Sequence, residues 1–327
     1  MKNKKEPVIS ICIPTYNRAN ALRQSLERYI NCIGFDDTVE IVISDNASTD
    51  DTRQVAMEFV SKYDNIKYFR NEENIRDSNF ELALKRGTGK YLKLQNDTTL
   101  FNKDAFVYMK DCISKSDENL PIFFTNDFIY TKFKGQEVIN CNSFNDYVSS
   151  LSTYVTAISC FGVWKSQLED IKDFTKYTKF LLNQDDWSYQ LLEKHGECVL
   201  YNRHYYEGLP KKSGGYHWFQ VHLDNYYKIM QPYIDKGLIS DSVVKQDKKY
   251  LLKHFIPELK YIYVYPINGW KFEKKGTFRY LWKYYKNEWY FYALMALYPF
   301  AVLILNSLHY SKAIFKRIIQ RINYVIK

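Results

Sequence analysis

The chain lacks the patterns that mark covalent or metal cross-links. Its six cysteines are scattered, with no C-x-x-C pair and no Cys/His spacing typical of a zinc site. We therefore expect free thiols, as is usual in the cytoplasm. The basic residues 1–5 run straight into an apolar strand without a separate apolar segment, so we expect no signal peptide. Internal repeats and low-complexity linkers are also missing, which excludes a repeat architecture.

The composition is that of a globular protein with a sizeable core. Its 327 residues allow two domains, or one large α/β domain with an extension, and 46% of the residues are hydrophobic. The net charge is +9, and the basic residues become denser towards the C-terminus. This balance indicates an acidic surface or a polyanion as a partner.

Two short apolar runs near the N-terminus stop abruptly at polar residues. The run over residues 8–13 leads into Pro14, Thr15, Tyr16, Asn17 and Arg18, and the run over residues 40–44 leads into Asp45. Such runs are typical of strands buried on both faces of a parallel sheet. Since ligands of open α/β sheets bind outside the carboxyl ends of the strands, we expect these residues to converge on one site. There Asp45 offers an acceptor for a nucleobase N–H, and Arg18 offers charge for a phosphate.

Helical patterns alternate with the strands, which predicts an α/β fold with a parallel sheet covered on both faces. Helices are expected over 20–33, 51–63, 78–86 and 185–195, and further strands over 89–95, 121–130 and 197–202. Ser78 and Glu81 form a capping box at the start of the third helix, and Gly87 stands where it should stop. From about residue 221 onward the pattern is helical.

The two strand ends resemble the start of a family 2 glycosyltransferase, where P-T-Y-N-R and D-N-x-S-x-D segments hold the base and ribose of a sugar nucleotide. The resemblance covers about residues 7–220. It implies a GT-A fold, in which a Rossmann-like, mostly parallel central sheet is flanked by helices. We expect a nucleotide half over about 1–100, an acceptor half over about 101–220, a helical extension over 221–288 and a membrane-associating segment over 289–327.

The resemblance also implies which residues bind the donor. The family's N-x-G-x-x-x-N-x-x-x-A pattern is matched by Asn74, Asn79 and Ala83, while Ile75 and Arg76 stand where a glycine is expected. Arg76 fits a solvated helix start nearly as well. The predicted donor-binding set is Pro14, Thr15, Tyr16, Asn17, Arg18, Asp45, Asn74, Asn79, Asn96, Asp97 and Thr98.

The third strand end departs from the family pattern. Relatives carry an Asp-x-Asp element there, whose last carboxylate binds a divalent metal on the diphosphate, but this chain has Asn96, Asp97 and Thr98. Mg²⁺ and Mn²⁺ prefer anionic oxygens, and Asn and Thr offer only neutral ones. We therefore expect weak metal dependence, with Asp97 as the candidate ligand if a metal binds. The alternative is that Asp97 merely starts a turn.

A pair of acids followed by tryptophan, Asp185, Asp186 and Trp187, resembles the family's E/D-D-W motif. In that motif the second acid is the general base, which takes the proton of the attacking sugar hydroxyl. Attack opposite the departing nucleotide diphosphate inverts the anomeric carbon. Asp186 is the predicted base, with Asp185 as a helper or a capping residue. Adjacent acids near a helix N-terminus are also ordinary capping chemistry.

A loop with two glycines follows the last predicted strand. The predicted contacts to the diphosphate or the acceptor are Lys211, Lys212, Ser213, His217 and Trp187. Glycines allow close backbone approach, and Lys and His can meet phosphate oxygens. If no metal is bound, this loop is the best candidate to neutralise the leaving group, and the alternative is a plain surface loop.

The C-terminal segment has the pattern of a membrane-associating region. Trp289 to Ser311 contains no Asp, Glu, Lys or Arg over 23 residues, which is long enough to cross a bilayer. Residues 312–327 hold five basic and no acidic residues, with the apolar ones on one helical face. A full span would place this basic tail on the far side, against the positive-inside tendency. We therefore favour in-plane or re-entrant insertion over a single span, and burial against another protein is the remaining alternative.

These patterns together predict an inverting glycosyltransferase at the cytoplasmic face of the cell membrane. It would move a sugar from a nucleotide-sugar donor, UDP-linked, to a lipid-linked glycan in the synthesis of a bacterial surface polysaccharide such as capsule or O-antigen. We expect an anionic membrane surface as a partner, and no nucleic acid. The alternative, motivated by the altered Asp-x-Asp element, is a catalytically inactive relative that binds the membrane or an assembly partner.

Overall fold

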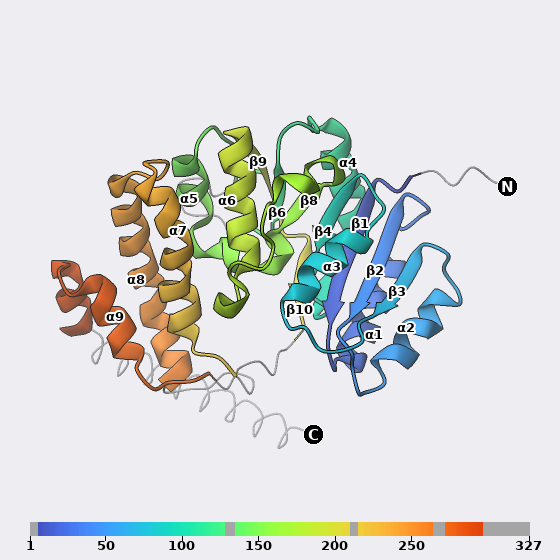
Figure 1. The fold of residues 1–327 in the computed structure, drawn as a ribbon, viewed down its shortest axis with the longest axis horizontal. Helices are drawn as coiled ribbons and strands as arrows, with labels where there is room; N and C mark the ends of the chain where they lie inside the picture. The colour runs from blue at the N-terminus through green and yellow to red at the C-terminus, as the bar shows by residue number, and fades with distance from the viewer. Residues whose placement is uncertain (1–5, 128–134, 210–214, 264–271, 297–327) are drawn as a thin grey trace, which may run out of the picture.

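The computed structural model describes residues 6–127, 135–209, 215–263 and 272–296. Five strands form the central sheet: β1 (Ile9–Thr15), β2 (Val39–Asp45), β3 (Ile66–Arg70), β4 (Tyr91–Leu94) and β8 (Gly162–Trp164). Their order is β3-β2-β1-β4-β8, and only β8 runs antiparallel to its neighbour (Figure 1). The mostly parallel sheet that the sequence predicts is therefore present.

Both faces of this sheet are apolar, because alternate residues of each buried strand point to opposite sides. On one face Ile11 and Ile41 pack with the helices α1 (Ala19–Ile30) and α2 (Thr52–Val60). On the other face Cys12 and Val42 pack with α3 (Ser78–Arg86). The helix α4 (Ala105–Lys115) also joins the first cluster. The carboxyl ends of β1, β2 and β4 are left free of covering helices and carry the polar residues of the candidate site.

Residues 101–220, the predicted acceptor half, contain a second sheet. Its strands are β6 (Ile122–Thr125), β7 (Val138–Cys141) and β9 (Cys198–Asn202), in the order β6-β9-β7. A small antiparallel pair joins β5 (Thr99–Phe101) to β10 (Tyr206–Gly208). The helices α5 (Phe144–Leu151) and α6 (Asn183–His195) flank this part, with the short 3₁₀ turns η1 (Ser152–Thr156), η2 (Ile158–Cys160), η3 (Lys165–Asp170) and η4 (Thr178–Phe180) between them. Residues 128–130 of the strand predicted over 121–130 lie outside the described residues.

The helical extension packs onto the acceptor half. It comprises the π-helical turn η5 (Gln220–Asn225) and the helices α7 (Tyr226–Asp235), α8 (Asp241–Tyr263) and α9 (Thr277–Tyr285). Tyr233, Leu251 and Leu281, one from each helix, belong to the same hydrophobic cluster as Leu191 of α6 and Leu200 of β9. The extension and the acceptor half therefore share one core, and the boundary at residue 220 stays a prediction.

Two details of the predicted helices are wrong, and a third, the end of α3 at Gly87, is confirmed. Asn20 does not cap α1, since the helix already begins at Ala19 and ends at Ile30. The capping box is absent, because Ser78 is the first helical residue and the residue before it makes no side-chain cap. Gly87 does end α3, but with an extended backbone at φ −70°. A glycine is needed there for packing, since an added Cβ would lie 2.7 Å from Leu92 Cδ2.

All six cysteines are buried and free. Within the described ranges, no helix combines the length and the apolar character that crossing a bilayer requires. Residues 297–327, which hold most of the predicted membrane-associating segment, lie outside the described part of the chain.

Candidate active site

A pocket of about 490 Å³ lies outside the carboxyl ends of β1, β2 and β4. This is where the order of strands reverses around β1, the usual ligand position in an open α/β sheet. Most of the predicted donor-binding residues line it, namely Pro14, Thr15, Tyr16, Arg18, Asn74, Asn79, Asn96 and Asp97. Asn46, Arg76, Asp77, Phe80, Ile158 and Leu181 complete the lining. The structure thus brings six separate segments of the chain to one cavity.

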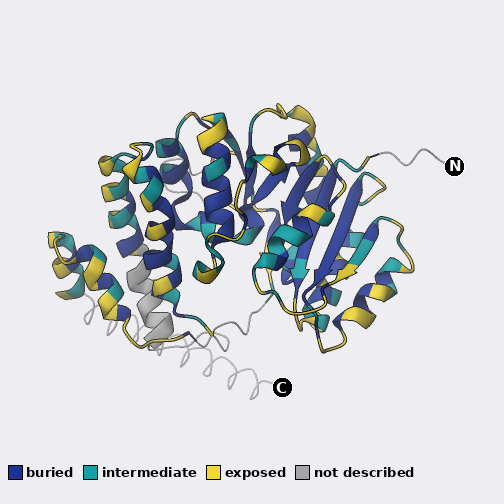
Figure 2. Ribbon diagram, viewed as in Figure 1, coloured by how far each residue is buried: buried dark blue, intermediate teal, exposed yellow. Residues whose placement is uncertain are grey.

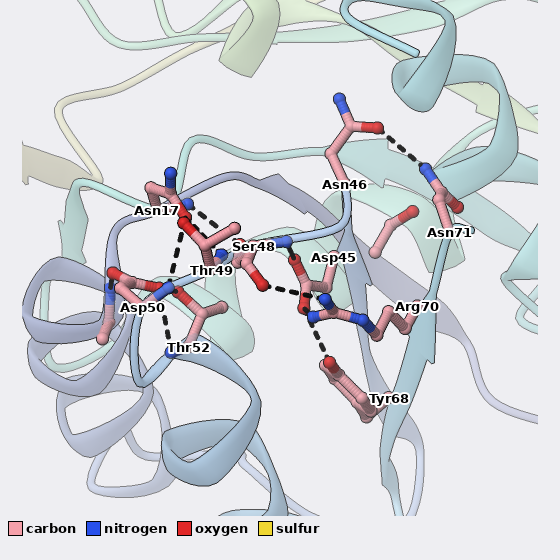
Figure 3. A network of polar contacts seen from close by, with 12 residues as sticks. Asn17, Asp45, Asn46, Ser48, Thr49, Asp50, Thr52, Tyr68, Arg70 and Asn71 are labelled. Atoms are coloured by element: carbon pink, nitrogen blue, oxygen red, sulfur yellow. Dashed lines mark hydrogen bonds and ion pairs between the residues drawn. The ribbon is translucent and has the colours of Figure 1, made fainter. Parts of the chain in front are cut away.

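Asn17 links the loops that follow β1 and β2 (Figure 3). It has a left-handed backbone at φ 52°, a conformation that asparagine tolerates better than most residues. Its backbone N–H donates to Ser48 Oγ at 2.9 Å, and its side-chain oxygen accepts from the backbone N–H of Thr49 at 2.7 Å. Asn17 does not line the pocket. Its hydrogen bonds hold the two loops against each other.

Asp45 is fully buried, and partners from three positions hold its carboxylate (Figure 3). One oxygen accepts from Tyr68 OH at 2.6 Å and from Arg70 Nη1 at 2.9 Å, and the other accepts from the Ser48 N–H at 2.9 Å. Burial and the hydrogen bond to Asp45 raise the pKa of Tyr68 to about 12, so this phenol remains a donor at neutral pH. A nucleobase can reach Asp45 only if Arg70 or Tyr68 gives way, and its reading of the base stays a prediction.

The sequence analysis missed Tyr68 and Arg70. They lie on β3, which has no motif of its own, and the register that sets Asp45 opposite Arg70 exists only in the assembled sheet. No local pattern could have found them.

A network of amides holds the loop before α3 against the end of β2. Asn46 donates to Asn74 Oδ1 at 2.8 Å and accepts from Asn71 Nδ2 at 3.0 Å. Asn79 accepts from Ser44 Oγ at 2.6 Å and donates to the Ser44 carbonyl at 2.8 Å. Asn46 and Asn71 are further residues that the sequence analysis did not single out. Because these amides bond to one another, the pocket wall is fixed before any ligand binds.

Asp97 forms an ion pair with Arg18 at the mouth of the pocket. Arg18 Nη1 lies 2.9 Å from one carboxylate oxygen, and Thr15 Oγ1 donates to the other at 2.8 Å. The Arg18 side chain is 47% exposed, whereas Asp97 is almost fully buried. Arg18 therefore stays within reach of a ligand, while the buried carboxylate of Asp97 holds its guanidinium in place. With Arg76, it supplies the cations of this pocket.

The residues around Asp97 do not suit a divalent cation. Asn96 donates from both its backbone N–H and its side-chain amide to Ser159 Oγ at 3.3 Å. Thr98 Oγ1 is buried without a hydrogen-bond partner. A hard cation prefers several anionic oxygens. This strand end offers one carboxylate, Asp97, which already forms an ion pair with the guanidinium of Arg18. No group of three or more His, Cys, Asp or Glu side chains fit for a metal occurs among the described residues.

The acid pair lies in the first turn of α6, and neither acid lines the pocket beside Asp97. Asp186 accepts from Gln190 Nε2 at 2.7 Å and from Tyr233 OH at 3.0 Å. Burial raises the pKa of Asp186, since the hydrogen bonds from Gln190 and Tyr233 only partly offset the desolvation. Asp185 is fully buried, and both of its oxygens lack a partner. Burial and the neighbouring Asp186 raise the pKa of Asp185 well above its usual value, because both disfavour its charged form.

Two predicted diphosphate or acceptor contacts lie in the interior instead. Trp187 is 1% exposed, donates to the Phe174 carbonyl at 3.1 Å and packs edge-on against Phe161. His217 is 4% exposed and sits between the Gln220 N–H at 3.2 Å and Thr277 Oγ1 at 3.4 Å. Phe161 and Phe174 pack against Trp187, and residues of η5 and α9 pack against His217. Neither side chain can touch a ligand in this conformation. Lys211, Lys212 and Ser213 lie outside the described residues.

A second pocket of about 600 Å³ adjoins the first, since Asn96 and Ile158 line both. Its other walls come from η1, η2 and β10 and include His204, Tyr206 and Glu207. Asn96 and Ile158 thus form a wall that the two cavities share. The sequence analysis did not find the second pocket, because its residues come from segments without a motif.

A family model described as "Glycosyl transferase family 2" matches residues 10–209. Among curated proteins, the chain is similar to an abequosyltransferase, RfbV, of Salmonella typhimurium, with 35% identity over 32% of this chain and 32% of that protein. It is also similar to the GalNAc(5)-diNAcBac-PP-undecaprenol beta-1,3-glucosyltransferase of Campylobacter jejuni, with 27% identity over 40% of this chain and 50% of that protein. The chain thus spans between a third and a half of these relatives' lengths.

Among solved structures, the mannosyltransferase PcManGT of Pyrobaculum calidifontis, in complex with GDP-Man and Mn²⁺, has a TM-score of 0.53. The two proteins share 15% sequence identity, over 91% of this chain and 81% of that one. At this identity the likeness concerns the fold alone, and it confirms the predicted GT-A architecture.

Proposed function

This chain belongs to glycosyl transferase family 2, and we propose that it transfers a sugar from a nucleotide-sugar donor to a hydroxyl group of a glycan acceptor. The observation that carries the proposal is the pocket outside β1, β2 and β4, where residues from four separate motif segments meet. Convergence of these segments is what a nucleotide-sugar site requires. It is not expected of polar strand ends that serve only as turns.

We place the nucleotide between Asp45 and Arg18. The base lies on the β2 side, where Asp45 can accept from its edge once Tyr68 or Arg70 gives way. The diphosphate lies against Arg18 and Arg76, the cations of the pocket. UDP is the proposed nucleotide, since a carboxylate acceptor suits the ring N–H of uracil.

We propose that transfer requires no divalent ion. In relatives that bind Mn²⁺, the metal offsets the charge of the leaving diphosphate. Here Arg18 stands beside Asp97 at 2.9 Å and can supply that charge itself. A fixed guanidinium stabilises the developing negative charge without reorganisation during the reaction.

The general base is proposed to come from the acid pair, with Asp186 in the role. The acceptor hydroxyl oxygen forms a bond to the anomeric carbon while its proton passes to the carboxylate. The bond from that carbon to the diphosphate oxygen breaks, which inverts the configuration. The raised pKa of Asp186 makes it a stronger base than an ordinary aspartate. In the reacting complex its hydrogen bond from Gln190 or Tyr233 must open to admit the hydroxyl.

The acceptor is proposed to occupy the second pocket, beyond Asn96. Its lining includes the polar side chains of Asn96, Asn126 and Glu207 but no lysine or arginine, and these polar groups suit the hydroxyl groups of a sugar. We propose a lipid-linked glycan of a bacterial surface polysaccharide, with the enzyme at the cytoplasmic face of the cell membrane, peripheral or monotopic. Support comes from the similarity to a transferase named for an undecaprenol-linked acceptor. Capsule and O-antigen are the pathways that the sequence suggested.

Donor hydrolysis and transfer, measured by release of nucleoside diphosphate from a panel of UDP-, GDP- and CDP-sugars, test this function. Arg18→Gln should weaken donor binding and turnover. Arg23→Gln is the matched control, because Arg23 lies on α1 and pairs with Glu58 outside the pocket. Absence of binding and release with every donor would favour the inactive relative. An equal loss in both arginine variants would show that the pocket is not the donor site.

A further inference from the structure

Four large aromatic side chains are exposed between residues 278 and 292. Phe278 is 58% exposed, Trp282 53%, Trp289 76% and Tyr292 49%. The other exposed large hydrophobic residues of the described ranges are spread singly between residues 16 and 181. Single exposed apolar residues are ordinary, whereas a cluster of aromatics on one surface marks an interaction site.

The structure holds this surface rigidly. Leu281 and Tyr285 of α9 are buried in the core that this helix shares with the acceptor half. Lys283 forms an ion pair with Asp224 of η5 at 2.6 Å. Trp282 and Tyr292 meet edge to face, with ring centroids 6.4 Å apart, which joins α9 to the helical residues 289–296 that follow it. The exposed aromatics therefore project from a fixed element.

The same stretch is basic. Residues 274–292 carry Lys274, Lys275, Arg279, Lys283 and Lys286 against one acid, Glu288. A pocket of about 530 Å³ beside Trp282 is lined by Arg279, Lys228 and Lys283. Asp224 pairs with both lysines, whereas Arg279 forms no ion pair within the described part of the chain. The surface thus presents cations next to exposed aromatic rings.

We propose that this aromatic-basic face, formed by Phe278, Arg279, Trp282, Lys286, Trp289 and Tyr292, docks on a bilayer that contains anionic phospholipid. Aromatic rings favour the interface between headgroups and acyl chains, and lysine or arginine near the surface is attracted by anionic lipid. A purely apolar partner would not use the cations, and a purely acidic partner would not use the rings. A bilayer interface satisfies both.

The face lies at the end of the molecule opposite α2, away from the nucleotide half (Figures 1 and 2). Docking there would leave the donor pocket open to solvent while the acceptor half sits near the lipid. In this respect the inference rests on the proposed function, since a lipid-linked acceptor would be presented to that half. It extends membrane contact to α9, for which the sequence analysis gave no role.

Co-sedimentation of the full chain with vesicles tests the face. The vesicles are phosphatidylcholine alone, or phosphatidylcholine with one quarter phosphatidylglycerol. Phe278→Ser, Trp282→Ser and Trp289→Ser combined should lower vesicle affinity at least tenfold. The control combines Ile33→Ser, Met57→Ser and Val107→Ser, similarly exposed residues of the loop after α1, of α2 and of α4, and it should bind as the wild type does.

Charge is tested separately. Arg279→Gln with Lys286→Gln should lower affinity for the anionic vesicles about 30-fold, the product of two cations near the surface. Affinity for pure phosphatidylcholine should stay unchanged. Wild-type binding that is equal to both kinds of vesicle would overturn the assignment of the basic residues.

Tryptophan fluorescence gives a second readout that does not depend on the serine variant being folded. Brominated lipid should quench tryptophan fluorescence of the wild type, and Trp282→Phe with Trp289→Phe should remove most of that quenching while vesicle binding persists. Unchanged binding of the serine variant, or wild-type protein that ignores anionic vesicles, would overturn the proposal. Residues 297–327 or a protein partner would then be the better assignment. Donor hydrolysis by the serine variant is measured in parallel, so loss of docking and failure of the proposed activity are distinguished.

Discussion

Replacing Lys93 by methionine should stabilise the protein at acidic and neutral pH. Lys93 is fully buried in β4. Its ammonium donates to the carbonyl oxygens of Ser159 and of Leu94, the latter at 3.3 Å. It lies 5.5 Å from the Tyr205 ring centroid and 6.0 Å from that of Phe124. No salt bridge joins it to a carboxylate in the described ranges, so the burial of its charge is only partly compensated.

The pKa gives the magnitude. Burial lowers the pKa of Lys93 from its ordinary 10.5 to about 7, which corresponds to about 5 kcal/mol against the charged form in the folded state. Methionine has a similar length and no charge, so it avoids this cost. Loss of the hydrogen bonds and ring contacts of Lys93 destabilises the variant by about 1–3 kcal/mol and so reduces this gain. The variant should therefore be more stable by a few kcal/mol at pH 6.

The sign of the pH dependence follows from linkage. Above pH 7 the folded wild type loses the Lys93 proton, while the unfolded chain keeps it until about pH 10.5. Unfolding then takes up a proton, so wild-type stability rises with pH through this window. Between pH 6 and 9 the advantage of the methionine variant should shrink by about 3 kcal/mol. The wild type and the methionine variant share all other titrating groups. The contributions of those groups therefore cancel in the difference between the two unfolding free energies.

Urea unfolding at pH 6, 7, 8 and 9, followed by circular dichroism, measures the difference. Lys90→Met is the matched control, because Lys90 precedes the same strand but is half exposed and faces Glu118 at 3.5 Å. Its stability relative to the wild type should not change with pH in this range. A Lys93→Met variant that is less stable at every pH by a constant amount would refute the reasoning. The favourable contacts of Lys93 would then outweigh the free-energy cost of burying its charge.

Three further predictions concern the candidate site. Asp186→Asn should keep the fold and donor binding but lower transfer about 10²- to 10⁴-fold, while Asp185→Asn should cost much less; near-normal turnover of the Asp186 variant would remove it from the role of base. Asp45→Ala should weaken nucleotide binding by about 1.5–3 kcal/mol in titration calorimetry with UDP, and unchanged affinity would exclude base reading. EDTA should leave most of the transfer activity, whereas activity that it abolishes and Mn²⁺ restores would identify Asp97 as a metal ligand.

Much of the candidate site followed from sequence because one rule of sheet architecture joins distant segments. Thr15, Arg18 and Asp97 are far apart in the chain, yet each follows a buried parallel strand, and such ends meet at one edge. The hydrogen bond from Thr15 and the ion pair with Arg18 show that they do meet at Asp97. Apolar runs and helical periodicity were sufficient to place these strands and helices.

Side-chain environment was less accessible to sequence reasoning. Trp187 and His217 look like available polar or aromatic groups in the sequence, but Phe161 and Phe174 bury the first, and η5 and α9 bury the second. The partners of Asp45 depend on the register of β3, which local sequence does not specify. Burial and register are set by contacts between segments, so a motif cannot report them.

The sequence by itself determined the α/β class, the alternation of its strands and helices and the set of strand ends that face one pocket, because hydrophobic periodicity and turn chemistry act locally. Only the tertiary structure decided which side chains are free. It pairs Arg18 with Asp97, closes Asp45 behind Tyr68 and Arg70, and leaves the aromatic-basic face of α9 uncovered. The physical reason is that solvent exposure and the partners of a charge depend on what the rest of the chain packs against it.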